Sequence, residues 1–253
     1  MTAPALAPAA STPASRRKLL AHLMAAALGV TFTAGIVAAQ PVRPAPRLSG
    51  PRLSVVELFT SQGCSSCPPA NENVANLAGR PDVLALSFGV TYWDKLGWKD
   101  TFASPQFTAR QYDYARGLRH DGPFTPQVVV NGRADVVGAQ RGEIERLIER
   151  TPLPAGPALS ARGGEVEIGG GQASGADVWF VTYDPRTVQV PVRAGENDGR
   201  TLPHRNVVKA LVRLGRWDGQ PAHYRLPPPQ PGLLGAVFVQ SGPGGAILAA
   251  TKL

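Results

Sequence analysis

Residues 53–70, LSVVELFTSQGCSSCPPA, hold the pattern that decides the fold. The opening part, LSVVELFT, is apolar or β-branched almost throughout, which is typical of a strand buried on both faces. Pro68 and Pro69 then favour the start of a helix, because the first helical turn has N–H groups without intrahelical partners. A buried strand, a short loop and a helix therefore follow one another, and the pair Cys64 and Cys67 lies where the loop meets the helix.

The next segments continue the alternation of strands and helices. Residues 83–90, VLALSFGV, predict a second buried strand, so the chain opens as a β-α-β unit. An aromatic-rich segment, 91–117, is expected to be a helical insertion, since Ser104-Pro105 combines an N-cap residue with proline at the first helical position.

Two short strands and a helix complete this part of the chain. The strands, 127–130 and 135–137, are joined by Asn131-Gly132, a favoured turn sequence, and 143–150 (EIERLIER) forms an amphipathic helix. The order β, α, β, α, β, β, α is that of a thioredoxin-like α/β domain, which we expect over residues 53–151.

The sequence pattern changes after Thr151-Pro152-Leu153-Pro154. Gly-rich breaks alternate with short strand-like runs, and helical periodicity is mostly absent. Regular turn signals between short strands favour a small all-β, sandwich-like domain. We therefore predict a boundary near residue 155 and a β-rich C-terminal domain over 155–253.

The N-terminus is organised as a signal peptide over residues 1–39, with a basic cluster at Arg16-Arg17-Lys18, an apolar stretch and a small-residue end before Gln40. The arginine pair resembles the twin-arginine export signature. A general secretory signal and an uncleaved anchor are the alternatives. Residues 40–52 form a Pro-rich linker. These features predict a periplasmic or secreted protein that meets the membrane only through the signal segment.

Composition narrows the function classes. The chain has 253 residues, a formal net charge of +8 and two cysteines, and its basic residues form no run interleaved with aromatic ones. Nucleic-acid binding is therefore not expected. His120, His204 and His223 lie at no short ligand spacing from the cysteines, so we expect no metal, and no cofactor is implied.

The Cys64-Ser65-Ser66-Cys67 motif is placed for thiol chemistry, because amides at a helix N-terminus stabilise a thiolate. Cys64 is the expected nucleophile and should face solvent, whereas Cys67, one turn along, should be more buried and resolve the mixed disulfide. A structural disulfide is an alternative, although so short a loop contributes little loop-closure entropy. A metal site is a further alternative, which needs additional ligands.

Phe124-Thr125-Pro126-Gln127 precedes the strand at 127–130. An X-Pro bond at a strand start can be cis, and together with the upstream cysteines this piece resembles the Thr-cis-Pro turn of thioredoxin-like proteins. The resemblance implies that Thr125 and Pro126 face the cysteines and that their backbone edge binds an extended substrate.

Glu57 is the one carboxylate in the strand that leads to the cysteines, and a buried acid there could accept a proton from Cys67. In thioredoxin-like folds the equivalent acid lies six residues before the first cysteine, whereas Glu57 lies seven before it. A solvated Glu57 at an edge is therefore an equal alternative, and Asp94 is another candidate. Four nearby aromatic residues are expected to serve packing, namely Tyr92, Trp93, Trp98 and Phe102.

Longer pieces carry a more specific resemblance: VVELFTSQGCSSCPPA, YWDKLGWKDTFASPQFTARQ, FTPQVVVNG and GENDGRTLPHRNVV. In these the chain is similar to the bacterial secreted family known as domain of unknown function 1223. Similarity to this family implies a thioredoxin-like fold. The substrate of the family is not established. Its pattern often has His-Val-Asp before Tyr-Trp-Asp, where this chain has Gly89-Val90-Thr91, so no role of that His or Asp carries over.

The leading hypothesis is an exported thiol-disulfide oxidoreductase that uses Cys64 and Cys67 on the thiols and disulfides of exported proteins. Whether the protein is an enzyme stays open at this point. One alternative is a non-catalytic binding or assembly protein with a structural Cys64–Cys67 disulfide. Another is a protein that maintains metal centres.

Overall fold

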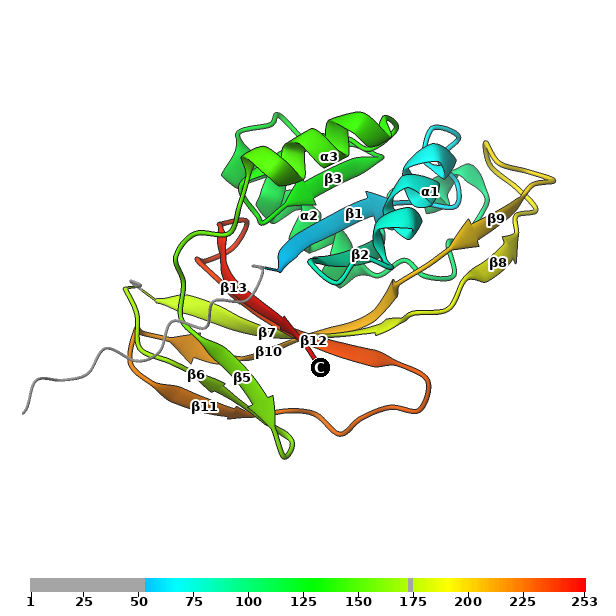
Figure 1. The fold of residues 1–253 in the computed structure, drawn as a ribbon. Helices are drawn as coiled ribbons and strands as arrows, with labels where there is room; N and C mark the ends of the chain where they lie inside the picture. Colours follow the sequence, from blue (N-terminus) through cyan, green and yellow to red (C-terminus); the bar gives the residue numbers. More distant parts are fainter. Residues whose placement is uncertain (1–52, 173–174) are drawn as a thin grey trace, which may run out of the picture. The chain divides into compact units, whose positions relative to one another are not determined.

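A computed structural model describes residues 53–172 and 175–253 (Figure 1). The predicted signal peptide, 1–39, and the predicted linker, 40–52, lie outside the described residues. Within the described ranges, no helix has both the length and the apolar character needed to cross a membrane.

The chain opens with the predicted β-α-β unit. β1 (Ser54–Thr60) and β2 (Val83–Gly89) are parallel neighbours, connected through α1 (Pro68–Leu77). Every residue of β2 is buried, which is why its sequence is apolar except for Ser87 instead of alternating between apolar and polar. α1 begins at the two prolines, and Cys67 is its N-cap residue.

The aromatic-rich insertion is helical, as predicted. A 3-10 turn, η1 (Asp94–Leu96), leads into α2 (Pro105–Leu118). The Ser104 hydroxyl caps α2 by accepting a hydrogen bond from the Gln106 amide at 3.2 Å. The capping prediction is therefore confirmed.

β3 (Gln127–Val130), β4 (Ala134–Val137) and α3 (Arg141–Arg150) complete this half of the chain. β3 is antiparallel to both β1 and β4. Between β3 and β4, Asn131 and Gly132 both have positive φ, at 52° and 62°, which is the conformation that makes Asn-Gly a favoured turn. The predicted element order is confirmed.

The C-terminal strands do not form a separate sandwich, and this part of the fold prediction is wrong. β7 (Ala176–Asp184), β10 (Val207–Trp217), β12 (Leu234–Gln240) and β13 (Ile247–Lys252) continue the N-terminal sheet. The order of its eight strands is β13-β12-β7-β10-β2-β1-β3-β4, and the two halves meet where Val207 of β10 pairs with Ser87 of β2. The fold is mixed α/β with one main sheet.

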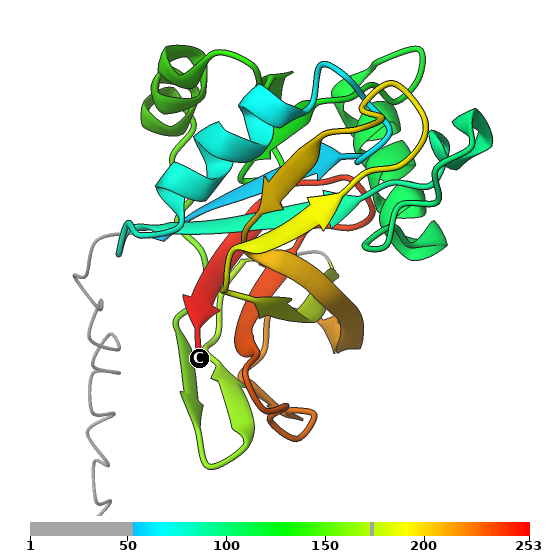
Figure 2. The same ribbon diagram turned by 90° about the vertical axis from the view of Figure 1, so that its right-hand side faces the viewer.

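Smaller antiparallel sheets flank the main one. β11 (Ala222–Arg225), β6 (Glu165–Ile168) and β5 (Leu159–Arg162) form a three-stranded sheet in that order. β8 (Val188–Pro191) and β9 (Thr201–His204) form a hairpin. Figure 2 shows this hairpin in yellow and ochre, running alongside α1 toward the cysteine loop.

Alternation along β1 divides the core between the two faces of the sheet. Val56 and Leu58 pack with α1 and α3 on one face. Val55 and Phe59 pack on the opposite face with α2 and with strands of the C-terminal half. β1, which carries residues of both cores, ends at Thr60 and leads directly into the cysteine loop.

Candidate redox site

Cys64 and Cys67 form a disulfide at the start of α1. The Cys67 amide donates to the Cys64 carbonyl at 3.2 Å, and the Asn71 amide donates to the Cys67 carbonyl at 3.0 Å, so the loop continues smoothly into the helix. Both cysteines are 0% exposed. The expectation that Cys64 faces solvent is therefore wrong for the oxidised protein, because neighbouring segments cover it.

One of these segments is the predicted Thr125-Pro126 turn. The bond between the two residues is cis, and the Thr125 hydroxyl donates to Cys64 Sγ at 3.3 Å. The Trp93 indole N–H in turn donates to Thr125 Oγ1 at 2.8 Å, which orients the hydroxyl toward the sulfur. The structure thus brings Thr125 and the cysteine together as the sequence predicted, while a role in substrate binding stays a prediction.

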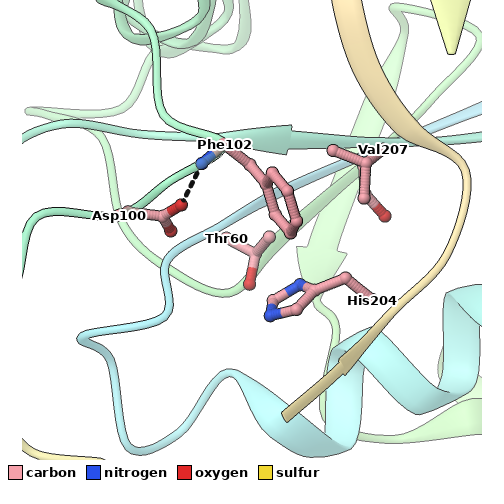
Figure 3. A pocket seen from close by; sticks show the side chains of 7 residues that line it. Thr60, Asp100, Phe102, His204 and Val207 are labelled. Atoms are coloured by element: carbon pink, nitrogen blue, oxygen red, sulfur yellow. Dashed lines mark hydrogen bonds between the residues drawn. The ribbon is translucent and has the colours of Figure 1, made fainter. Parts of the chain in front are cut away.

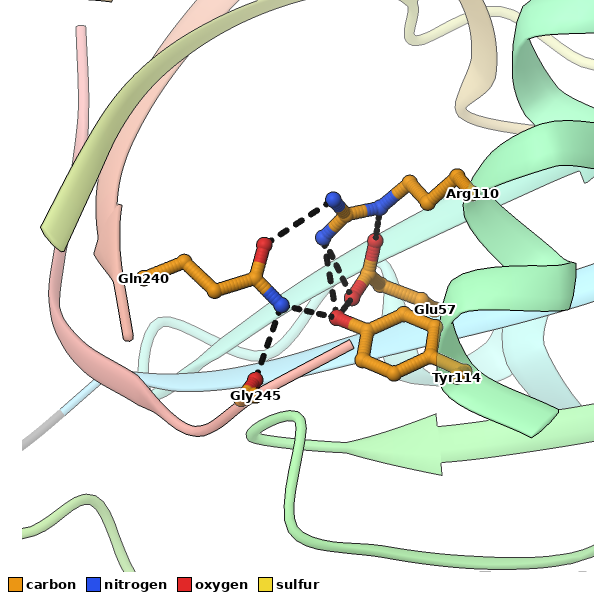
Figure 4. Close-up of polar contacts among 5 residues, drawn as sticks. All are labelled: Glu57, Arg110, Tyr114, Gln240 and Gly245. Carbon is orange, nitrogen blue, oxygen red and sulfur yellow. Dashed lines mark hydrogen bonds and ion pairs between the residues drawn. The ribbon is translucent and has the colours of Figure 1, made fainter. Parts of the chain in front are cut away.

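Glu57 is buried but engaged elsewhere (Figure 4). Its carboxylate forms an ion pair with Arg110 of α2, with Oε1 2.7 Å from Nε, and accepts a hydrogen bond from the Tyr114 hydroxyl. Gln240 of β12 binds both Arg110 and Tyr114. Burial raises the pKa of Tyr114, so its hydroxyl keeps the proton that it donates.

The position of Glu57 follows from strand alternation. Glu57 lies between Val56 and Leu58, whose side chains face α1, so its own side chain points to the opposite face with α2. None of its hydrogen bonds in the described residues reaches Cys64 or Cys67. The seven-residue spacing therefore puts the carboxylate on the face away from the helix that Cys67 caps.

A second buried carboxylate supports the loop that precedes the cysteines. Asp100 accepts hydrogen bonds from the backbone amides of Gln62 and Phe102, each at 2.7 Å. The Trp98 indole donates to Gln62 Oε1 at 2.8 Å, so this tryptophan has a polar role besides packing. Burial raises the pKa of Asp100. Asp94, the other candidate, accepts from the Asp100 amide at 3.2 Å.

A small polar cavity lies beside this loop, where the ends of β1 and β2 meet β9 (Figure 3). Its volume is about 10 Å³, roughly the space of a single water molecule. Its polar lining residues are Thr60, Ser87, Asp100 and His204. His204 Nε2 is buried and has no hydrogen-bond partner among the residues the structure describes, and burial lowers the pKa of His204 to about 4.

The β8–β9 hairpin supplies contacts that sequence reasoning missed. Glu196 and Asn197, in the turn of this hairpin, bind the cysteine loop more than 130 residues earlier in the chain. The Glu196 carboxylate accepts from the Ser65 amide at 3.0 Å and from its hydroxyl at 2.7 Å. These residues lie in the piece GENDGRTLPHRNVV, but nothing in its composition indicates which part of the fold it contacts.

Metal ligands do not gather at the cysteines. No group of three or more His, Cys, Asp or Glu side chains suited to a metal ion occurs in residues 53–172 and 175–253. His120, one of the histidines considered from the sequence, has its Nε2 atom 2.8 Å from Asp135 Oδ2. The chemistry that the arrangement offers is that of the disulfide itself.

Fold and site together define a class: a mixed α/β protein with a Cys-x-x-Cys disulfide between a buried parallel strand and the helix that follows it. The family model described as "Protein of unknown function (DUF1223)" matches residues 55–240, and the chain belongs to that family. The family resemblance noted from the sequence is thereby confirmed, whereas the secretion and the thioredoxin-like fold expected from it stay predictions. No curated protein matches the chain.

Two solved structures are similar to the chain. Protein AGR_C_4864 from Agrobacterium tumefaciens is 37% identical, with a TM-score of 0.65, and the match covers 80% of this chain and 94% of that one. HBP35 of Porphyromonas gingivalis is 16% identical, with a TM-score of 0.48 over 81% of this chain and 76% of that one.

Proposed function

We propose that the protein is a thioredoxin-like thiol-disulfide oxidoreductase that exchanges electrons between Cys64–Cys67 and cysteine thiols of exported proteins. The observation that supports it best is the Thr125 hydroxyl at 3.3 Å from Cys64 Sγ, opposite the start of α1. A hydrogen-bond donor there stabilises negative charge on the sulfur, which is what a nucleophilic or leaving thiolate needs.

The exchange has two steps. A thiolate of the partner attacks Cys64 Sγ, the Cys64–Cys67 bond breaks, and the electron pair leaves with Cys67 as a thiolate. A second partner thiolate then attacks the partner's own sulfur in this mixed disulfide, and Cys64 leaves as a thiolate. The partner loses two electrons and becomes a disulfide, while Cys64 and Cys67 gain them and take up the two protons. The reverse sequence reduces a partner disulfide.

The start of α1 favours thiolate chemistry at this pair of cysteines. Amides at a helix N-terminus carry a partial positive charge and stabilise anions within the first turn. Cys67 is the N-cap residue of α1, and Cys64 lies one turn earlier. Both sulfurs therefore lie where a thiolate gains from the field of the helix.

Export is part of the proposal. The signal peptide predicted over residues 1–39 would place the protein in the periplasm or outside the cell, where protein disulfides persist. The test is replacement of Arg16 and Arg17 by lysine, which should leave precursor in the cytoplasm if the twin-arginine route is used. Unchanged export of that variant would exclude this route.

One observation favours the alternative, a binding or assembly protein with a structural disulfide. Both cysteines are fully buried, as inert disulfides often are. Trapping discriminates the two functions. In a Cys67→Ala variant the mixed disulfide cannot be resolved, so Cys64 should accumulate partner proteins that reductant releases. A Cys64→Ala variant is the matched control, because it leaves one thiol but removes the nucleophile.

Capture by Cys67→Ala and not by Cys64→Ala is the expected result. Equal capture by both variants, or capture by neither, would support the structural disulfide.

A further inference from the structure

The turn of the β8–β9 hairpin contains a short segment, Gly195–Asn197, which we call the strap. Asn197 is 0% exposed and anchors it. Its side-chain amide donates to the carbonyl oxygens of Gln62 at 2.9 Å and of Cys64 at 2.8 Å. Arg200 donates to Asn197 Oδ1 at 2.7 Å, and because a guanidinium can only donate, it fixes the amide nitrogen toward the cysteine loop.

Glu196 adds a charged contact on the other side of Cys64. Its carboxylate binds both the amide and the hydroxyl of Ser65, and these two hydrogen bonds hold the pKa of Glu196 below its usual value. The carboxylate itself is exposed, so water weakens the contact. Asn197 and Glu196 thus hold the backbone of the loop at Gln62, Cys64 and Ser65.

The charge of Glu196 favours the oxidised state of the loop. In the disulfide Cys64 carries no charge, and the Ser65 amide is free to bind the carboxylate. A thiolate at Cys64 would be repelled by that carboxylate and would compete with it for the neighbouring amide. Because coupling is reciprocal, a strap that binds the oxidised loop more tightly also makes reduction less favourable.

We propose that the strap must be displaced before a thiol reaches Cys64, and that Asn197 and Glu196 are positioning residues that set how readily the disulfide is reduced. This inference rests on the proposed function and deepens it. The strap restricts the partners to those that open the hairpin turn. It also comes from the C-terminal half of the chain, which gives that half a part in the redox site.

The experiment measures the rate at which dithiothreitol reduces the oxidised full-length protein at one pH. Asn197→Ala removes the two buried hydrogen bonds to the cysteine loop, together with the one from Arg200, and should increase the rate about tenfold. Glu196→Gln keeps an acceptor but removes the charge, and should increase the rate about two- to fivefold. Asp198→Asn is the matched control, since it removes the same charge from the same turn at a residue without a contact to Ser65 among those described.

Thermal unfolding of each oxidised variant checks that the fold is kept. If Asn197→Ala does not fold, the reduction rates of Glu196→Gln and Asp198→Asn are compared on their own to test the proposal. Equal reduction rates for all folded variants and the wild type would overturn the proposal. An acceleration by Asp198→Asn as large as that by Glu196→Gln would overturn it too. Failure of the proposed function is separate: the accelerations would appear as expected, but Cys67→Ala would capture no partner, and the strap would then shield a structural disulfide.

Discussion

At the scale of single residues, a shift of one position along β1 decides the role of Glu57. A carboxylate at position 58 would face α1 and the helix start, whereas at position 57 it faces α2 and meets Arg110. The face to which Glu57 points could be inferred from the sequence. Glu57 lies seven residues before Cys64, and successive side chains of a strand point to opposite faces. What the sequence did not contain was the partner, since Arg110 lies more than 50 residues away.

Glu57→Gln should destabilise the protein by about 3 kcal/mol, because it leaves the buried Arg110 guanidinium without its counter-charge. Asp82→Asn is the control: it breaks a partly exposed pair with Arg80 and should cost less than about 1 kcal/mol. Urea unfolding of both variants measures the difference. A Glu57→Gln effect as small as that of Asp82→Asn would mean that the ion pair in Figure 4 contributes little.

Thr125→Val should slow exchange with glutathione several-fold while changing stability little. Valine fills the same volume but removes the hydroxyl that donates to Cys64 Sγ. Thr125→Ser keeps the hydroxyl and should restore the rate. The measurement is the rate constant of mixed-disulfide formation for the three proteins, and a serine variant as slow as the valine variant would assign the effect to packing.

At the scale of elements, β9 docks His204 against the ends of β1 and β2. The folded-state pKa of His204, about 4, lies below the value of about 6.5 expected in the unfolded chain. Between these values the unfolded state binds a proton that the folded state does not. The stability contributed by a neutral buried His204 is therefore present above about pH 6.5 and is lost as the pH falls toward 4.

We predict that this loss amounts to about 3 kcal/mol between pH 7 and pH 4. His204→Phe removes the titrating group, so its stability should fall less over the same range. Urea unfolding at several pH values compares the variant with the wild type and with His223→Phe, an exposed control in β11. Parallel pH curves for all three proteins would exclude His204 as the cause.

Some of these elements could be predicted from the sequence and others could not. The strands and helices from β1 to α3 follow from local patterns: apolar runs, prolines at helix starts, and Asn131-Gly132 in a turn. The strap could not be predicted, because a polar run between glycines is typical of any exposed turn. Its contact with Ser65 depends on the direction in which the β8–β9 hairpin extends, and the packing of β9 against α1 sets this direction.

At the scale of the whole molecule, the sheet joins both halves of the chain through β2 and β10. Phe59 and Phe88 pack in one cluster with Val181 and Phe238, so the C-terminal strands complete the core next to the cysteine loop. The Ile247 amide also donates to the Asn131 carbonyl at 2.9 Å, so the start of β13 contacts the β3–β4 turn. The sequence pattern predicted short strands in the C-terminal half but not their partners.

A shared core predicts one cooperative unfolding transition for the oxidised protein, with the loss of near-ultraviolet and far-ultraviolet circular dichroism at the same denaturant concentration. A chain ending at residue 154 should not fold, since it would expose the edge of β2 and the apolar face around Phe59. Two separate transitions, or a folded fragment, would show that the halves are independent.

The proposed oxidoreductase function requires that the Cys64–Cys67 disulfide is redox-active. The most direct test is its reduction potential, measured by equilibrating the full chain with glutathione buffers and trapping thiols with a gel-shifting maleimide. Thiol-disulfide exchange predicts reversible reduction with a potential between about −300 and −120 mV, the range of known protein thiol couples. A disulfide that stays oxidised below about −300 mV is a structural one and would contradict the proposed function.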